Sequence, residues 1–363
     1  MIKINFKENK KDLNNRSGLY FAGMNQEILN LAVLHNISSV KEDGDVKVFY
    51  SFPQDVEIIR TLKKLQYNIL SYFYEECKIN SLKKDSDLVF NICDGFKDPG
   101  DEYKLIENLE KEKIPYTGCS SSTTKLCQNK FDLKKVFKSL KINCPNGQLF
   151  ENPGEMLNSN LKFPLILKPL GEHGSRGIEE DSVIFNEDQL RKKLSQLFFQ
   201  FNKPILIEDY IEGREFNVPI IGNKNPDALG ILEIDYSRHF EDKPKILTYK
   251  AKWSKNSNDF RNTYSIIAKL NKKDETKIYS TAISAYKAAS CSGYASVDLR
   301  MDDDGNVFVI EINPNCYIAP ESDMLKAALS RDWSYEQLLD KIIGYAVERF
   351  SLQNKILISE EIK

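Results

Sequence analysis

Short apolar runs alternate with amphipathic stretches along this chain, and the alternation predicts a mixed fold of strands and helices. Leu105, Ile106 and Leu109, for example, recur at the spacing of one helix face. The pattern predicts helices over 103–113, 132–140, 276–290 and 335–350. It predicts strands over 46–50, 87–92, 163–167, 204–208, 216–221, 228–234, 246–249, 294–301 and 307–313. These elements indicate an α/β (mixed α+β) protein in several lobes.

The bulk composition narrows the class of protein. A chain of 363 residues suits two or three domains. Its formal charge of -2 gives no overall positive field that would hold nucleic acid. Nowhere do 18 apolar residues follow one another, so we expect no segment that spans a bilayer. The segment from Met1 to Leu13 has no signal-peptide core, so we expect a cytoplasmic protein. The seven cysteines form no C-x-x-C pair and the three histidines are scattered, so the cysteines are interpreted as reduced, packed thiols.

A hairpin near the carboxyl end carries the most informative polar residues. Residues two apart share a strand face. One face of the first strand therefore carries Ser296, Asp298 and Arg300. One face of the second strand carries Val309, Glu311 and Asn313. If these faces coincide, two carboxylates and an amide oxygen form a site that suits Mg²⁺. The alternative is a solvated strand face, although the flanking apolar residues favour a buried sheet in which a metal compensates the charge.

A lysine and a glycine-rich loop point to phosphate binding. Lys168 ends an apolar strand and is followed by Pro169-Leu170-Gly171-Glu172-His173-Gly174-Ser175-Arg176-Gly177. Glycines let backbone N–H groups approach a phosphate closely. The loop lacks the Walker pattern, and a plain surface turn is the alternative interpretation. Lys130 and Lys252 are uninformative alone, because lysines are usually on the surface.

A further strand, from Ile205 to Ile211, ends in a backbone hinge before Gly213-Arg214-Glu215. Such a hinge can offer adenine one N–H and one C=O. One neighbouring carboxylate can accept from the exocyclic amine, and a second can bind the ribose hydroxyls. A simple turn or the start of a surface helix is the alternative.

Taken in order, these pieces resemble a known family. The order is a lysine, a lysine with a glycine loop, an E-x-Y hinge, a third lysine, and a final D…E-x-N. The chain resembles the ATP-grasp carboxylate–amine ligases, and specifically the D-alanine–D-alanine ligase-like members. The resemblance extends from about Phe90 to the tail helix. Its close matches are Phe90-Asn91-Ile92, Ile114-Pro115-Tyr116-Thr117-Gly118, Lys168-Pro169 and Glu311-Ile312-Asn313-Pro314-Asn315.

The resemblance implies a three-lobed ATP-grasp fold: an N-terminal Rossmann-like lobe over 1–128, a central subdomain over 129–212 and a C-terminal subdomain over 213–363. It implies that the loop with Gly174, Ser175 and Gly177 closes over the phosphates. The other implied contacts are Lys130 and Lys168 to the phosphates, Glu208 with the Tyr210 and Ile211 backbone to adenine, Glu215 to ribose, Lys252 to the γ-phosphate, and Asp298, Glu311 and Asn313 to two Mg²⁺ ions, with Mn²⁺ as an alternative.

The resemblance also implies a two-step reaction between small-molecule substrates. A carboxylate attacks the γ-phosphate of ATP to give an acylphosphate, and an amine then displaces phosphate. D-alanine–D-alanine ligases stabilise the oxyanion with an arginine at the position of Ser296. We therefore expect Arg300 to serve the oxyanion or a substrate carboxylate, with a structural ion pair as the alternative. His173 could act as a base toward the amine, or be a bystander.

The substrate-binding motifs of the family are altered here. The amino-terminal glycine-rich segment with its glutamate has no counterpart in Met1 to Val48. A second motif is replaced by Cys93-Asp94-Gly95-Phe96 and Asp98-Pro99-Gly100-Asp101-Glu102. We therefore expect an acid substrate other than free D-alanine: an amino acid, a dipeptide or a peptide C-terminus.

Three rival functions stay open: a true D-alanine–D-alanine ligase, a non-catalytic ATP-binding regulatory protein and a ligase acting on a protein terminus. The sequence leaves the oligomeric state open, although homodimers are common in the family that it resembles.

Overall fold

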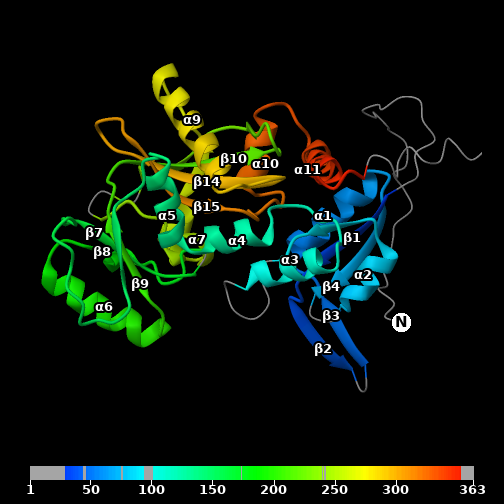
Figure 1. Cartoon of the computed structure of the whole chain (residues 1–363), viewed down its shortest axis with the longest axis horizontal. Coiled ribbons are helices and arrows are strands. Elements are labelled where there is room, and N and C mark those ends of the chain that lie inside the picture. Colours follow the sequence, from blue (N-terminus) through cyan, green and yellow to red (C-terminus); the bar gives the residue numbers. More distant parts are fainter. Residues whose placement is uncertain are drawn as a thin grey trace, which may run out of the picture.

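The structure is a computed structural model that describes residues 29–43, 46–74, 77–93, 101–172, 174–238, 240 and 243–352. Its amino-terminal lobe is built on a parallel sheet of order β4-β1-β5 (Figure 1). The elements of this lobe are β1 (Asn30–His35), β2 (Ser39–Asp43), β3 (Val46–Tyr50), α1 (Pro53–Lys64), β4 (Asn68–Phe73), α2 (Ile79–Asp85), β5 (Leu88–Asn91), α3 (Glu102–Lys111) and α4 (Ser121–Gln128). Crossover helices between parallel strands give this lobe its Rossmann-like layering.

The central lobe, green in Figure 1, is an antiparallel sheet of order β6-β9-β7-β8 packed on α6. Asn186 begins α6 by accepting a hydrogen bond from the Gln189 amide, and Asn202 ends it in a left-handed conformation with φ of 48°. The elements are α5 (Lys130–Ser139), β6 (Gly147–Phe150), β7 (Leu165–Pro169), η2 (Glu180–Ser182), β8 (Val183–Ile184), α6 (Glu187–Phe201) and β9 (Ile205–Asp209).

The carboxyl-terminal lobe is a larger antiparallel sheet of order β13-β12-β10-β14-β15, with β11 paired to β10. Helix α9 covers its apolar face. The elements are β10 (Arg214–Ile221), β11 (Asp227–Ala228), β12 (Leu232–Asp235), α7 (Tyr249–Trp253), α8 (Asn258–Asn262), β13 (Tyr264–Ile267), α9 (Lys272–Ala288), β14 (Tyr294–Met301), β15 (Val307–Asn313), α10 (Asp323–Leu329) and α11 (Tyr335–Arg349).

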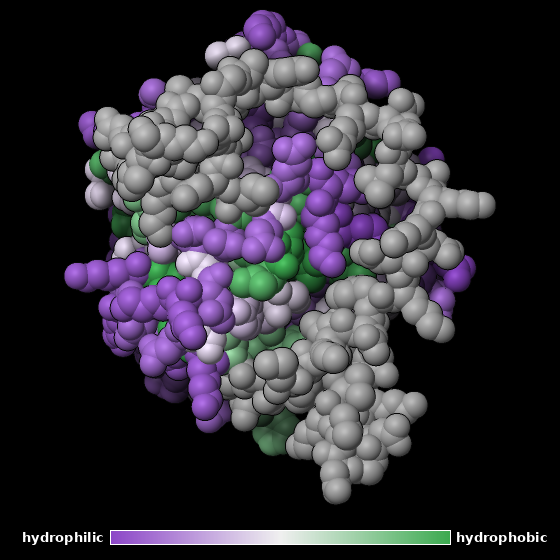
Figure 2. All heavy atoms as spheres, turned by 90° about the vertical axis from the view of Figure 1, so that its right-hand side faces the viewer, coloured by the Kyte–Doolittle hydropathy of each residue, from purple (hydrophilic) through white to green (hydrophobic). Residues whose placement is uncertain are grey.

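Helix α11 joins the first and third lobes. Its apolar face shares one core with α1 and β1, through residues that include Leu31, Leu62 and Leu339. Arg349, at its end, donates to the carbonyl oxygens of Gly118 and Tyr116, the latter at 2.6 Å. The two lobes are therefore fixed to each other beside the polar sheet face described below. Figure 2 views the molecule from the side of the amino-terminal lobe. Between its grey atoms the coloured surface is mainly hydrophilic, with a smaller hydrophobic area near the centre.

The predicted fold class is confirmed, and most predicted elements are present within a few residues. The strand predicted over 246–249 is wrong. This segment runs without strand pairing into α7, where Thr248 accepts a hydrogen bond from the Ala251 amide. Carbonyl groups in and next to this segment accept hydrogen bonds from side chains and not from a neighbouring strand. The Lys245 carbonyl accepts from Arg300, and the Leu247 carbonyl accepts from Ser175. The strand predicted over 228–234 is divided between β11 and β12. The three predicted lobe ranges stay a prediction, and each of the three sheets named above falls within one of them.

Candidate active site

One face of the carboxyl-terminal sheet is polar where its central strands meet. Cross-strand pairing places Asp298 of β14 between Asn217 of β10 and Glu311 of β15, and places Ser296 opposite Asn313. Directly opposed residues point to the same side of an antiparallel pair. Asp298, Glu311 and Asn313 therefore gather as the sequence predicted.

A β-bulge between the two strands corrects one detail of the predicted hairpin. The register passes from Asp298–Glu311 to Leu299–Val309, which leaves Ile310 as the extra residue. Val309 therefore lies in the apolar core with Leu299 and does not share the polar face with Glu311. A bulge of one residue shifts the alternation of side chains along the strand that carries it. Sequence alternation alone cannot locate such a shift.

Two amides hold the Asp298 carboxylate. Asn217 Nδ2 donates to Oδ1 at 2.6 Å and Asn313 Nδ2 donates to Oδ2 at 3.0 Å. Burial and the nearby Glu311 charge raise the pKa of Asp298 to about 6, against opposing effects of Lys252 and the Asn217 hydrogen bond. Two neighbouring carboxylates, whose negative charge is only partly compensated, and an amide form a donor set that suits a hard divalent cation. Among the described residues no group of three His, Cys, Asp or Glu side chains gathers for a metal. The predicted metal site therefore depends on the side-chain oxygens of Asp298, Glu311 and Asn313.

The predicted phosphate-binding lysines converge on the same region. Lys130 Nζ lies 3.0 Å from Glu311 Oε1 and donates to the Glu172 carbonyl at 3.1 Å, at the glycine-rich loop. Lys252, on α7, is close enough to lower the pKa of Asp298. Lys168 lies on β7 with its Nζ 2.5 Å from Glu208 Oε1. Lys130 and Lys252 thus lie near the metal-ligand candidates, and Lys168 lies at Glu208, beside the predicted hinge.

The hinge carboxylate Glu208 has a second partner that the sequence did not reveal. Lys134 Nζ lies 2.8 Å from Glu208 Oε2, and both side chains are almost fully buried. Burial alone would raise the pKa of Glu208, but Lys134 and Lys168 outweigh it and lower the pKa to about 2. Lys134 stands one helical turn after Lys130 on α5, and that i, i+4 spacing was the available signal. Tyr210 and Ile211 follow directly at the end of β9.

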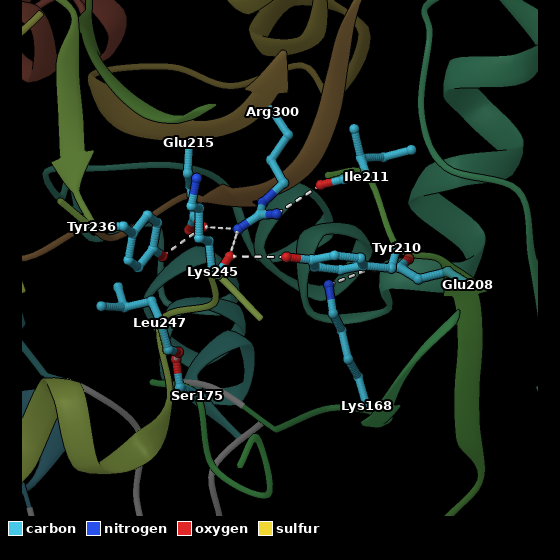
Figure 3. Close-up of polar contacts among 10 residues, drawn as sticks. All are labelled: Lys168, Ser175, Glu208, Tyr210, Ile211, Glu215, Tyr236, Lys245, Leu247 and Arg300. Carbon is cyan, nitrogen blue, oxygen red and sulfur yellow. Dashed lines mark hydrogen bonds and ion pairs between the residues drawn. The ribbon is translucent and has the colours of Figure 1, made fainter. Parts of the chain in front are cut away.

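The predicted ribose carboxylate, Glu215, belongs to a buried network (Figure 3). Its Oε2 accepts from Tyr236 at 2.8 Å and from Arg300 Nη2 at 2.6 Å. Arg300 is 5% exposed and also donates to the carbonyl oxygens of Ile211, at 2.6 Å, and Lys245. The geometry therefore corresponds to the structural ion pair, the alternative to an oxyanion role for Arg300.

The glycine-rich loop contacts the segment that leads into α7. Ser175 Oγ donates to the Leu247 carbonyl at 2.6 Å, and Trp253 Nε1 donates to the Gly174 carbonyl at 2.8 Å. Gly177 has a φ of 79°, and a Cβ added there would come within 2.7 Å of the Pro169 ring. The loop conformation therefore requires glycine at this position. His173 lies outside the described residues, as do residues 94–100 of the two replaced segments.

Comparisons with known proteins agree with this fold. A family model described as D-ala D-ala ligase C-terminus matches residues 142–344. A D-alanine–D-alanine ligase of Carboxydothermus hydrogenoformans is 30% identical over 302 residues, 80% of this chain and 91% of that enzyme. An uncharacterized protein of Sinorhizobium fredii is 28% identical over 272 residues, 74% of this chain and 77% of that protein. The structure of D-alanine–D-alanine ligase from Bacillus anthracis complexed with ATP has a TM-score of 0.69 and 23% identity, covering 90% of this chain and 99% of that one.

The fold and the polar sheet face thus define an ATP-grasp enzyme, an ADP-forming ligase that joins a carboxylate to an amine and uses ATP with Mg²⁺. Within that class, the chain belongs to the D-alanine–D-alanine ligase family. Enzymes of this family act on small molecules. No helix in the part of the chain that the structure describes is long and apolar enough to cross a membrane.

Proposed function

We propose that this enzyme forms a peptide or amide bond between an amino acid or short peptide and an amine, through an acylphosphate. The observation that supports this most directly is the approach of Lys130 to Glu311, beside Asp298 and Asn313. A phosphoryl group bound there would be flanked by two carboxylates that can hold cations and by an ammonium group. Phosphoryl transfer needs this combination of positioning and charge stabilisation.

The substrate carboxylate oxygen attacks the γ-phosphorus, and ADP leaves with the electrons of the broken P–O bond. The amine nitrogen then attacks the acyl carbon, phosphate leaves, and the nitrogen loses a proton. In this proposal Lys130, Lys168 and Lys252 orient the phosphates, while Glu208, Tyr210, Ile211 and Glu215 hold the nucleoside. Asp298, Glu311 and Asn313 would hold two Mg²⁺ ions, with Mn²⁺ able to replace them, and these cations would neutralise charge on the transferred group. His173 is proposed as the base toward the amine.

The acid substrate is proposed to differ from free D-alanine. The relatives named as D-alanine–D-alanine ligases match most of this chain. The glycine-rich segment with its glutamate, which anchors the first D-alanine in those ligases, nevertheless has no counterpart in Met1 to Val48. A free or peptide-bound amino acid fits the retained chemistry. We further propose a homodimer, and light scattering on the purified chain would test it through a mass of twice 41.8 kDa.

The test is a phosphate-release screen with Mg·ATP and pairwise pools of amino acids and dipeptides, including D-alanine alone. We expect release that requires both an acid and an amine, and a product whose mass is the sum of the two less one water. A Glu311→Gln variant should be inactive in the same pools. Turnover with D-alanine alone would establish the cell-wall ligase instead. ATP binding without turnover in any pool would support a regulatory protein.

A further inference from the structure

We propose that Arg300 is a positioning residue for the nucleotide, which sets the distance between the adenine hinge and the ribose carboxylate. The inference rests on the proposed function, because it concerns the same ATP site. It assigns Arg300 a place in substrate binding, and it removes this side chain from the acyl-transfer step.

Arg300 binds two groups that lie on either side of one turn. Ile211 lies in the hinge after β9 and Glu215 lies on β10, with the turn at Gly213 between them. Arg300 Nη1 donates to the Ile211 carbonyl at 2.6 Å, and Nη2 donates to Glu215 Oε2 at 2.6 Å. One rigid, planar guanidinium thus binds both sides of the turn. The spacing between a group that would receive adenine and one that would receive ribose is therefore fixed by this side chain (Figure 3).

The Arg300 side chain is also enclosed by protein groups. Its side chain is 6% exposed, and its guanidinium carbon lies 5.3 Å from the centre of the Tyr210 ring. It also donates to the Lys245 carbonyl, and the Tyr210 hydroxyl donates to the same oxygen at 3.4 Å. A buried charge that is fully paired is costly to redirect. An oxyanion donor must instead point to the place where charge develops on the substrate.

Arg300 is also connected to the glycine-rich loop. Lys245 begins the segment that reaches Leu247, whose carbonyl accepts from Ser175 of that loop at 2.6 Å. Arg300 therefore contacts the hinge, the ribose carboxylate and the segment that holds the phosphate loop. Its removal should weaken nucleotide binding, and it should leave turnover at saturating ATP largely intact.

The test compares Arg300→Met with Arg214→Met as a matched control. Arg214 also lies on this sheet and forms a two-pronged ion pair with Glu233, at 2.7 Å for each contact, on the opposite face. Calorimetry measures the dissociation constant for a non-hydrolysable Mg·ATP analogue. We expect Arg300→Met to weaken binding at least tenfold and Arg214→Met to change it less than twofold. Arg300→Lys, which keeps a charge near Glu215 and loses the planar fork, should lie between them.

The preference for ribose over deoxyribose is a second measurement, and a general loss of stability would not change it. The wild-type chain should bind ATP more tightly than 2′-deoxy-ATP or 3′-deoxy-ATP, because Glu215 is held toward the sugar. In Arg300→Met the ratio of the dissociation constants for the deoxy nucleotide and for ATP should fall toward one. Tyr236→Phe removes the other hydrogen bond to Glu215 and should reduce the preference in the same direction, which gives a second variant if Arg300→Met does not fold.

Three results separate the hypotheses. Unchanged nucleotide affinity in Arg300→Met, with turnover at saturating ATP reduced a hundredfold or more, would overturn the inference and restore the oxyanion role. Unchanged affinity and unchanged turnover would overturn it as well. Failure of the wild-type chain to bind nucleotide at all would count against the proposed function itself.

Discussion

Lys130 Nζ lies 3.0 Å from Glu311 Oε1, and this contact joins the first helix of the central lobe to the last strand of the carboxyl-terminal sheet. Both side chains are largely shielded from water, with 7% and 21% of their surface exposed. This ion pair between two lobes is largely buried, unlike exposed ion pairs on helix surfaces, which water screens and which contribute little to stability. It marks the place where phosphate, cation and lysine would meet.

Replacement of Lys130 by Met should lower kcat/KM for ATP at least a hundredfold, because it removes the charge proposed to face the phosphates. Lys135→Met is the matched control on the same helix. Lys135 is 63% exposed and pairs only locally, with Asp132, so its loss should change kcat/KM less than twofold. Steady-state kinetics on both variants measures the difference. Similar losses in the two variants would show that Lys130 has no special relation to the nucleotide.

Asn217 should tune the cation site although the sequence did not single it out. Its Nδ2 donates to Asp298, and its own Oδ1 is buried without a hydrogen-bond partner among the described residues. Loss of a hydrogen-bond donor to a ligand side chain typically weakens metal affinity by about 10–100-fold. Asn217→Leu should therefore weaken Mn²⁺ binding in the nucleotide complex by about that factor, as measured by electron paramagnetic resonance titration. Asn262→Leu, at the end of α8, should leave the titration unchanged.

Trp253 should report nucleotide binding. The chain has two tryptophans. Trp253 contacts the described part of the glycine-rich loop, where its Nε1 donates to the Gly174 carbonyl at 2.8 Å. Trp333 lies elsewhere, with Lys341 Nζ 4.5 Å from its ring centre. In a Trp333→Phe background, addition of Mg·ATP should change the fluorescence of Trp253 excited at the red edge. The reciprocal Trp253→Phe protein should show little change, and equal responses in both proteins would contradict the assignment.

Glu208 should make stability depend on acid pH. Its pKa is lowered from 4.5 to about 2 in the folded protein, chiefly by Lys134 and Lys168 acting against burial. A lowered carboxyl pKa contributes stability above the unfolded pKa, and that stability is lost as pH falls from about 4.5 toward 2. The contribution is about 3 kcal/mol at neutral pH. Urea unfolding at pH 5 and pH 3 should show this decline in wild type and a smaller one in Glu208→Gln. Parallel declines would contradict the pairing.

Gly213 should tolerate no side chain. Its φ is 134°, and an added Cβ would lie 2.1 Å from the Met301 carbonyl oxygen, which is backbone and cannot yield easily. Gly213→Ala should therefore lower the free energy of unfolding by more than about 3 kcal/mol. Gly344→Ala in α11 should be neutral or slightly stabilising, because nothing beyond the neighbouring residues and backbone of its own helix lies within 4 Å of the new Cβ. Denaturant unfolding of both variants would measure the contrast.

Local patterns predicted a good part of this protein. The strand pair β14–β15 and the helices α9 and α11 follow directly from apolar spacing, because periods of two and of 3.6 residues are properties of neighbouring residues. The convergence of Asp298 with Glu311 followed from the short hairpin that joins their strands. The strand predicted over 246–249 was wrong, because a short apolar run cannot reveal that the carbonyl groups of Lys245 and Leu247 accept hydrogen bonds from Arg300 and Ser175.

By itself, then, the sequence determined the element types, the hairpin and the list of residue types that could serve ATP and Mg²⁺. Only the tertiary structure decided the partners: Lys134 with Glu208, Asn217 with Asp298, and Arg300 with Glu215 across 85 residues. The reason is physical. Which charged groups pair in a buried site depends on how sheets from different lobes approach and on where a bulge turns a strand, and neither is encoded in the spacing of adjacent residues.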